Sequence, residues 1–223
     1  MSDSSGNVIA GTSSDIVLTN VDNTISGAGH IGYGQLKLIN EKDGIIIATG
    51  THSLQIDTGL NVVINEGVLK STGSGGLIIH SDVLNAGEIW AYGGDVTIHG
   101  AVTGSGSAMI GGSATMWLVS AASVNVAFTE DSAGTLLLGD SFNFSGLVSG
   151  FDQNDQLALA DLMFSSDMSL DYAANETGGT LTLSDGNQVV SLSLLGQHDA
   201  DGWQVAAHDG GGTLLTYSQS TLV

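Results

Sequence analysis

The first half of the chain repeats one pattern, in which a short apolar run ends in Asn, a Gly follows, and a second apolar run ends in Gly. Four segments carry it: VDNTISGAG (residues 21–29), LINEKDGIIIATG (38–50), VVINEGVLKSTG (62–73) and VLNAGEIWAYGG (83–94). Glycines recur at intervals of 23 and 20 residues in two series, Gly44, Gly67, Gly87 and Gly50, Gly73, Gly93. Short strands joined by Gly and Asn corners at a period of about 20 residues predict an all-β fold, a parallel β-solenoid or β-helix.

The composition fits a folded chain whose interior is built from stacked strands. Glycine accounts for 33 of the 223 residues, about twice its usual share of roughly 7%. Apolar residues make up 42% of the chain, which is too many for intrinsic disorder. We therefore expect rungs of about 20 residues with Ile, Val and Leu stacked inward. Helical periodicity is weak throughout, so few or no helices are expected.

The pattern divides the chain into three parts. Residues 1–20 contain two short β-prone stretches, NVIA and DIVLT, which predict either an N-terminal cap or an assembly strand that docks on a neighbouring subunit. Residues 21–126 are predicted to form the β-solenoid repeats. Residues 127–223 are predicted to form a C-terminal β region and cap, because hairpin-like runs and aromatic residues crowd there and a solenoid needs its last rung covered. Within this region, Asp185-Gly186 between alternating strands indicates a hairpin turn.

Charge restricts the partners of this chain. It has 23 acidic residues against three lysines and no arginine, which gives a formal net charge of −20. Nucleic-acid binding needs Lys and Arg to displace phosphate counterions, so we expect no nucleic-acid partner. No apolar run approaches 18 residues, so we expect no membrane insertion. The acidic surface is either simply solvated or holds divalent cations.

Two absences in the sequence concern the compartment. There is no cysteine, which removes disulfides, thiolate metal sites and cysteine nucleophiles. The first residues, MSDSSGNVIAGTSSD, contain neither a basic stretch nor an apolar core of the kind found in a secretory leader. If the protein is exported, we therefore expect export without an N-terminal signal peptide.

Three stretches of the C-terminal half stand out: GLVSGFDQNDQLALADLMF (146–164), GGTLTLSDGNQVVSLSLLG (178–196) and DGGGTLLTY (209–217). They resemble the ends of large secreted repeat proteins of Gram-negative, especially α-proteobacterial, bacteria. Proteins of that kind are β-strand-repeat adhesins and extracellular-matrix proteins, often exported by type I secretion with an uncleaved C-terminal signal. The resemblance implies an extracellular or cell-surface location. The calcium-binding nonapeptide GGxGxDxUx of some such proteins does not occur in full in this chain.

One short segment, FDQNDQ (151–156), carries the candidate metal ligands. It brings Asp152, Asn154 and Asp155 within four residues. Oxygen ligands this close can hold Ca²⁺ if further carboxylates or carbonyls complete six to eight contacts. The alternative is a turn in which Asp and Asn side chains cap their own backbone, which such sequences favour. Calcium is therefore the one cofactor that the sequence suggests.

Two groups of ring side chains are candidate binding features. His80 and His99 end similar strands 19 residues apart, so in a solenoid they are expected on adjacent rungs about 5 Å apart. They are either a stacked exposed ladder or two ligands of a metal. Trp90, Tyr92 and Trp117 are either an aromatic strip for sugar stacking or part of the packing.

These observations favour a structural role over catalysis. We expect an extracellular protein that self-assembles into a bacterial surface, biofilm-matrix or filament structure as a homopolymer. The alternative is a monomeric adhesin module that contacts a polysaccharide or a cell surface. A glycan-active β-helical enzyme is the third hypothesis, since hydrolysis needs only two carboxylates. However, no dense Asp/Glu motif stands out and Arg is absent, so we expect no catalytic residues.

Overall fold

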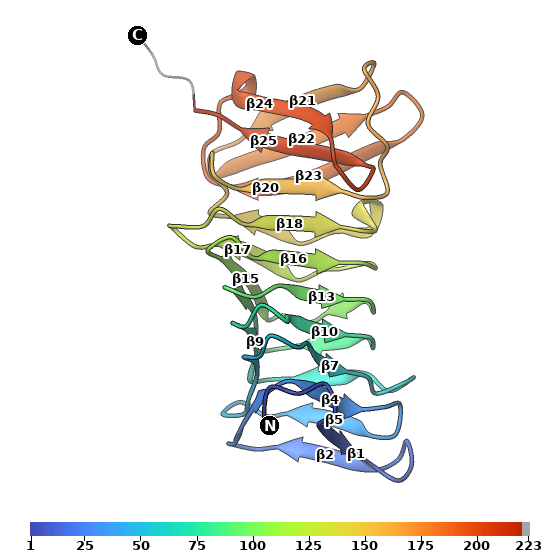
Figure 1. Ribbon diagram of the computed structural model, residues 1–223. Helices are drawn as coiled ribbons and strands as arrows, with labels where there is room; N and C mark the ends of the chain where they lie inside the picture. Colours follow the sequence, from blue (N-terminus) through green and yellow to red (C-terminus); the bar gives the residue numbers. More distant parts are fainter. Residues whose placement is uncertain (220–223) are drawn as a thin grey trace.

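The computed structural model describes residues 1–219, and over most of them parallel strands stack into a β-solenoid of about eight turns (Figure 1). Each of the first five turns contributes one strand to each of three sheets, called here sheets A, B and C, and the later turns contribute strands to sheets A and C. The parallel strands of sheet A are β1 (Val8–Ala10), β4 (Gly29–Gly32), β7 (Leu54–Ile56), β10 (Leu77–Ile79), β13 (Val96–Ile98), β16 (Thr115–Leu118), β18 (Thr135–Leu138) and β20 (Gln156–Leu159). Sheet B contains β2 (Val17–Asn20), β5 (Lys37–Asn40), β8 (Val63–Asn65), β11 (Val83–Asn85) and β14 (Val102–Thr103). Sheet C contains β3 (Thr24–Gly27), β6 (Ile45–Ala48), β9 (Val68–Ser71), β12 (Glu88–Tyr92), β15 (Ser107–Gly111), β17 (Asn125–Phe128) and β19 (Leu147–Ser149).

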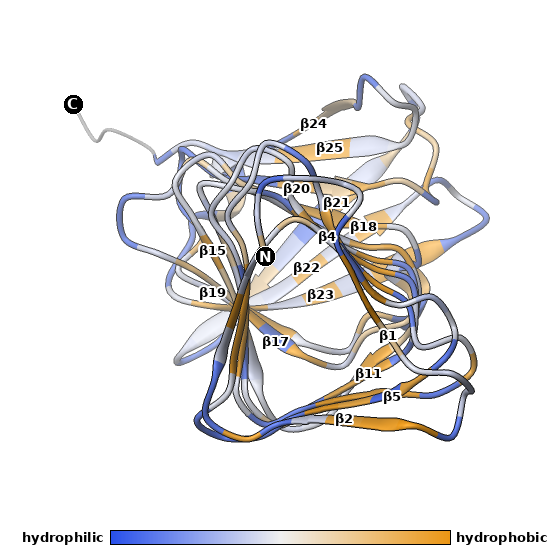
Figure 2. Ribbon diagram, turned by 60° about the horizontal axis from the view of Figure 1, so that its bottom comes forward, coloured by the Kyte–Doolittle hydropathy of each residue, from blue (hydrophilic) through white to orange (hydrophobic). Residues whose placement is uncertain are grey.

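The three sheets form the sides of the cross-section, and the core lies between them (Figure 2). Alternate residues of each strand point inward, and the second rung buries Ile31, Leu38 and Ile46 completely. Paired residues in successive rungs are separated by 18 residues at the shortest (Ser107 to Asn125) and by 25 at the longest (Gly29 to Leu54). The predicted rung of about 20 residues with an aliphatic interior is therefore confirmed.

A column of buried asparagines explains why Asn recurs in the repeat. Asn20, Asn40, Asn65 and Asn85 end the strands of sheet B and are almost fully buried. The side-chain amides of Asn20, Asn40 and Asn65 each donate to the side-chain oxygen of the next asparagine in the column, at 2.8, 2.9 and 2.7 Å in turn. The amides also donate to backbone carbonyls at the corner. The asparagines thus satisfy polar backbone groups that the turn between sheets B and C would otherwise leave buried without partners.

A column of glycines runs beside the asparagines. A Cβ atom on Gly67, Gly87 or Gly106 would lie 2.2, 2.1 or 2.3 Å from the carbonyl oxygen of the equivalent glycine one rung earlier. These glycines are therefore required by the close approach of successive rungs. The series that the sequence suggested through Gly50 and Gly73 continues in Gly94, not Gly93. A Cβ atom on Gly94 would lie 2.2 Å from the Gly73 carbonyl oxygen, whereas Gly93 has a left-handed φ of 81°.

The solenoid is longer than the predicted range of 21–126. It begins at β1, which pairs with β4, and parallel pairing continues through β17, β18 and β20. The boundary at residue 127 was therefore wrong. The later rungs lose the Asn and Gly corners but keep buried, alternating strands, so the change of sequence marks different corner chemistry and not the end of the stack.

Antiparallel hairpins close the C-terminal end, as predicted for a cap, although they begin later than expected. The strands β21 (Ser169–Ala174), β22 (Gly178–Ser184) and β23 (Val189–Leu195) extend sheet C beyond β19. The strands β24 (Trp203–Ala207) and β25 (Thr213–Tyr217) extend sheet A beyond β20. The structure also has two short 3-10 turns: η1 (Ser141–Asn143) lies between β18 and β19 of the solenoid, and η2 (Ala200–Gly202) lies between β23 and β24 of the cap. The predicted Asp185-Gly186 turn joins β22 to β23, with Gly186 at a φ of 89°.

An aromatic cluster fills the cap. Trp203 stacks on Phe151, with ring centroids 5.4 Å apart, and also packs against Tyr172 and Tyr217. His198 lies inside this cluster, and its two ring nitrogens are 3.1 Å from the Gly196 carbonyl oxygen and 3.0 Å from that of Phe151. The last turn of the solenoid is therefore covered by large, mostly buried rings.

Candidate functional site

The two ends of the solenoid differ, and this difference defines the first candidate site. Among the strands of residues 1–219, β1, β2 and β3, called here the open rung, each have a neighbour on one side only. Ile9, Leu18 and Ile25 occupy its inward positions and are only partly buried. Their direct partners in the second rung, Ile31, Leu38 and Ile46, are completely buried. The open rung thus leaves apolar core positions partly exposed, whereas hairpins cover the opposite end (Figure 1).

Residues 1–20 are part of the solenoid and are not a free assembly strand. β1 pairs with β4, and β2 pairs with β5, both within the same chain. These contacts fit the alternative of an N-terminal cap, and docking of the segment around Val8 to Leu18 on a neighbour stays a prediction. Within residues 1–219, the outer edge of the rung that this segment builds is unpaired.

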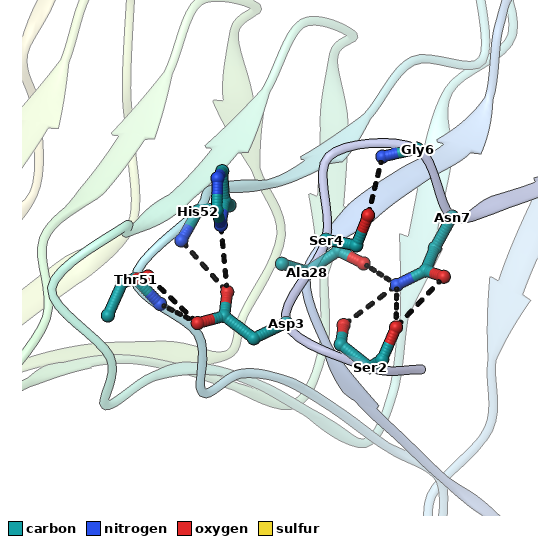
Figure 3. Close-up of polar contacts among 8 residues, drawn as sticks. All are labelled: Ser2, Asp3, Ser4, Gly6, Asn7, Ala28, Thr51 and His52. Carbon is teal, nitrogen blue, oxygen red and sulfur yellow. Dashed lines mark hydrogen bonds and ion pairs between the residues drawn. The ribbon is translucent and has the colours of Figure 1, made fainter.

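Residues 1–7 form an N-terminal strap that lies along the corner between sheets C and A (Figure 3). The α-amino group of Met1 donates to the Ser26 carbonyl oxygen, and the Asn7 side-chain amide donates to the Ala28 carbonyl oxygen at 3.0 Å. Gly27 makes room for the strap, because a Cβ atom there would lie 2.2 Å from the Met1 carbonyl oxygen.

Asp3 anchors the strap two rungs into the solenoid. Its carboxylate accepts hydrogen bonds from the backbone N–H groups of Thr51 and His52, each at 3.0 Å, and from the Thr51 hydroxyl at 2.8 Å. The Nδ1 atom of His52 also lies 3.2 Å from the Oδ1 atom of Asp3 (Figure 3). Hydrogen bonds from the backbone of His52, and then from that of Thr51, lower the pKa of Asp3 well below its ordinary value. Sequence reasoning missed this contact because nearly fifty residues separate its partners and no motif marks it.

The proposed metal ligands Asp152, Asn154 and Asp155 do lie together, in the turn before β20, and they bond largely within the protein. Asp152 accepts the N–H of Asn154 at 2.7 Å, which is the self-capping turn that the sequence offered as the alternative. Asp155 is buried and accepts the Ser132 hydroxyl at 2.6 Å and the Asp152 N–H at 3.1 Å. Burial raises the pKa of Asp155. Within residues 1–219, no group of three or more His, Asp or Glu side chains is arranged to hold a metal ion.

The histidine pair has the predicted geometry. His80 and His99 lie on adjacent rungs at the end of β10 and β13, with ring centroids 5.2 Å apart and planes 2° from parallel. Both rings are exposed, and His80 contacts the Gln55 side chain at 3.3 Å. This arrangement is the stacked ladder, since parallel rings at this spacing face each other.

The three aromatic residues do not form one strip. Trp90 and Tyr92 belong to β12 in sheet C and meet edge to face, with centroids 6.4 Å apart. Trp117 belongs to β16 in sheet A and lies near His99. The predicted strip is therefore corrected to one aromatic pair on sheet C and a separate indole on sheet A.

Comparison with known proteins adds no family assignment. No protein-family model matches this sequence, and no curated protein matches it significantly. Among residues 1–219, no helix has the length and apolar character needed to cross a membrane.

Proposed function

We propose that this protein is a non-enzymatic, extracellular structural subunit that assembles end to end into filaments of a bacterial surface or matrix. The observation that carries the proposal is the partial exposure of Ile9, Leu18 and Ile25 at positions whose second-rung partners are fully buried. A second subunit on the open rung would bury these side chains, and burial of apolar surface stabilises association by about 25 cal/mol per Å².

The strand order supports a head-to-tail arrangement. Sheet A runs from β1 at the open rung to β24 at the cap, and sheet C runs from β3 to β21. In the described part of the chain, each of these terminal strands has an unpaired outer edge, which is a template for pairing with another chain. A contact between unlike ends does not close on itself, and it propagates into a filament unless the rotation between subunits closes a ring.

The location rests on the resemblance of segments within residues 146–217 to secreted repeat proteins. Export without an N-terminal signal peptide and a homopolymeric state belong to the same proposal. A monomeric adhesin module is the alternative, and the size of the protein in solution separates the two.

The test is sedimentation and negative-stain electron microscopy of the purified chain, in physiological salt with millimolar Ca²⁺ to offset the net charge of −20, over a hundredfold range of concentration. Wild type is expected to form fibres whose width matches one solenoid. Leu18→Lys places a charge on the open rung and should abolish fibres, whereas Leu84→Lys, on the outer side of a middle rung, should retain them. A wild-type protein that stays near 22.6 kDa at every concentration overturns the proposal whatever the variants do. Discrete dimers would reject the head-to-tail contact and favour pairing of two open rungs.

A further inference from the structure

A second surface, on the side of the solenoid and separate from both ends, has the chemistry of a sugar-binding site. We propose that a groove at the start of β9, β12 and β15, called here the lateral groove, binds a neutral polysaccharide chain. The groove has a volume of about 460 Å³, within the usual range of ligand sites. Its lining residues are Lys42, Glu66, Gly67, Val68, Ala86, Gly87, Glu88, Ser105, Gly106 and Ser107.

The lining offers hydrogen-bond partners of both kinds. Three stacked glycines, Gly67, Gly87 and Gly106, keep the groove free of side chains at their positions, and their backbone N–H groups donate within the solenoid, so the partners for a ligand are side chains. Glu66 and Glu88 supply carboxylate acceptors, and Lys42 supplies an ammonium donor. Ser105 and Ser107 add hydroxyls that both donate and accept. A sugar hydroxyl also donates and accepts, so this mixture suits a ligand that carries many hydroxyls.

An aromatic pair adjoins the groove through Glu88. This glutamate lines the groove, and its Oε2 atom accepts the Trp90 indole N–H at 2.8 Å. Tyr92 meets Trp90 edge to face, and the Lys70 ammonium lies 5.3 Å from the centroid of the Trp90 ring and 5.2 Å from that of Tyr92. These contacts hold the rings in place before any ligand arrives, which lowers the entropic cost of stacking a sugar ring against them.

The repeat of the solenoid favours a polymer over a single sugar. The groove crosses three successive rungs, in which Val68, Glu88 and Ser107 occupy equivalent positions. Neighbouring strands lie about 4.8 Å apart, so a linear chain along the solenoid axis passes an equivalent side-chain position on each rung. Many weak contacts along one chain then act together.

The charge of the site and of the whole molecule favours a neutral ligand. Two carboxylates oppose the one ammonium group in the groove, and the net charge of −20 repels polyanions at long range. Lys70 does not reverse this balance because its ammonium is engaged with the two aromatic rings. An acidic polysaccharide such as alginate is therefore expected to bind much more weakly.

The test uses the full chain in native gels that contain hydroxyethylcellulose, mannan or dextran, with alginate as the acidic comparison. At least one neutral polymer should retard the protein. Trp90→Ala and Glu66→Gln should weaken that retardation at least tenfold, and Trp117→Ala, a matched exposed tryptophan on sheet A, should leave it unchanged. Leu18→Lys should also bind normally, because the lateral groove lies away from the open rung.

Several results would overturn the inference. One is that no neutral polymer retards the protein. Another is that Trp117→Ala weakens the retardation as much as Trp90→Ala does. A third is that alginate alone retards the protein. Release of reducing ends from a bound polymer would replace binding with hydrolysis by Glu66 and Glu88. Any of these results would leave the proposal of end-to-end assembly unaffected, because that proposal is tested on fibres in the absence of polysaccharide.

Discussion

At the scale of single residues, a substitution in the asparagine column should lower the free energy of unfolding strongly although it removes only one small side chain. Asn65 accepts from Asn40 and donates to Asn85, and all three side chains are completely buried. Asn65→Ala would leave polar groups on both neighbours without partners, so we expect a loss of about 2–3 kcal/mol in the free energy of unfolding. Asn187→Ala, in the exposed hairpin turn, is the matched control and should change stability by less than about 0.5 kcal/mol. Urea unfolding measures both, and equal effects would contradict a role for the column.

The glycine column makes an independent prediction. A Cβ atom on Gly87 would lie 2.1 Å from the Gly67 carbonyl oxygen, so Gly87→Ala must push two rungs apart. Overpacking of this kind costs about 1–3 kcal/mol or more. Gly210→Ala is a suitable control, because the nearest atom to a Cβ there is 3.5 Å away and belongs to a side chain. Gly87→Ala should therefore melt at a clearly lower temperature than Gly210→Ala. If Gly87→Ala melts at the wild-type temperature, successive rungs can move apart at little cost in free energy.

The sequence pattern predicted the residue types at the corners but not their exact roles. The repeat pattern predicts that Asn23, in the VDN of the first repeat, occupies the corner. In the structure Asn20 joins the column instead, because it pairs with Asn40. A shift of a few residues like this is decided by strand register, which depends on packing against the next rung. Spacing along one chain does not contain that information.

At the scale of elements, the strap links the chain start to the third rung through one carboxylate. Asp3→Asn removes the negative charge that four donors surround, so the Thr51 and His52 amides should exchange hydrogen faster than in wild type. Asp43→Asn, on an exposed loop, is the control. Hydrogen exchange followed by mass spectrometry, with wild type and variant compared at the same pH, measures the difference in exchange rate of the Thr51 and His52 amides.

The pH dependence of the strap follows from the lowered pKa of Asp3. A carboxyl group with a lowered pKa in the folded state stabilises that state fully above its unfolded pKa of about 3.9. The stabilisation is lost as the pH falls from there through the folded pKa. The difference between wild type and Asp3→Asn should therefore be constant from pH 5 to pH 7 and shrink only below about pH 4. A difference that vanishes near neutral pH would show that the carboxylate does not hold the strap.

Element boundaries were predicted less well than element types. The parallel stack was evident from the repeat, but its continuation through β17, β18 and β20 was not, because the Asn and Gly corners end near residue 106. In the later rungs other groups perform the same task, such as the buried Asp155 carboxylate that accepts the Ser132 hydroxyl of the preceding rung. The same contact holds Asp155, one of the three predicted metal ligands, in the turn before β20.

At the scale of the whole molecule, the shape favours association between copies of the chain, whereas the charge opposes it. The solenoid offers open strand edges at its two ends, whereas a net charge of −20 opposes contact between copies. The three lysines all lie at or before residue 70, so the cap has no Lys or Arg side chain to pair with the carboxylates of a neighbour's open rung. Screening or bridging by cations is thus the physical requirement for end-to-end association.

Divalent cations should therefore raise both stability and assembly. Binding that is selective for the native or assembled state adds about 2.7 kcal/mol when the cation is at 100 times its Kd, which corresponds to roughly 5–10 °C in Tm for a chain of this size. We expect melting in millimolar Ca²⁺ to exceed melting in EDTA by several degrees at matched ionic strength, with more fibres in Ca²⁺. Asp152→Asn locates the effect: loss of the shift would assign calcium to the turn before β20, and retention would assign it elsewhere on the acidic surface. Coincident curves for wild type in Ca²⁺ and EDTA would reject specific binding, because screening alone is the same in both solutions.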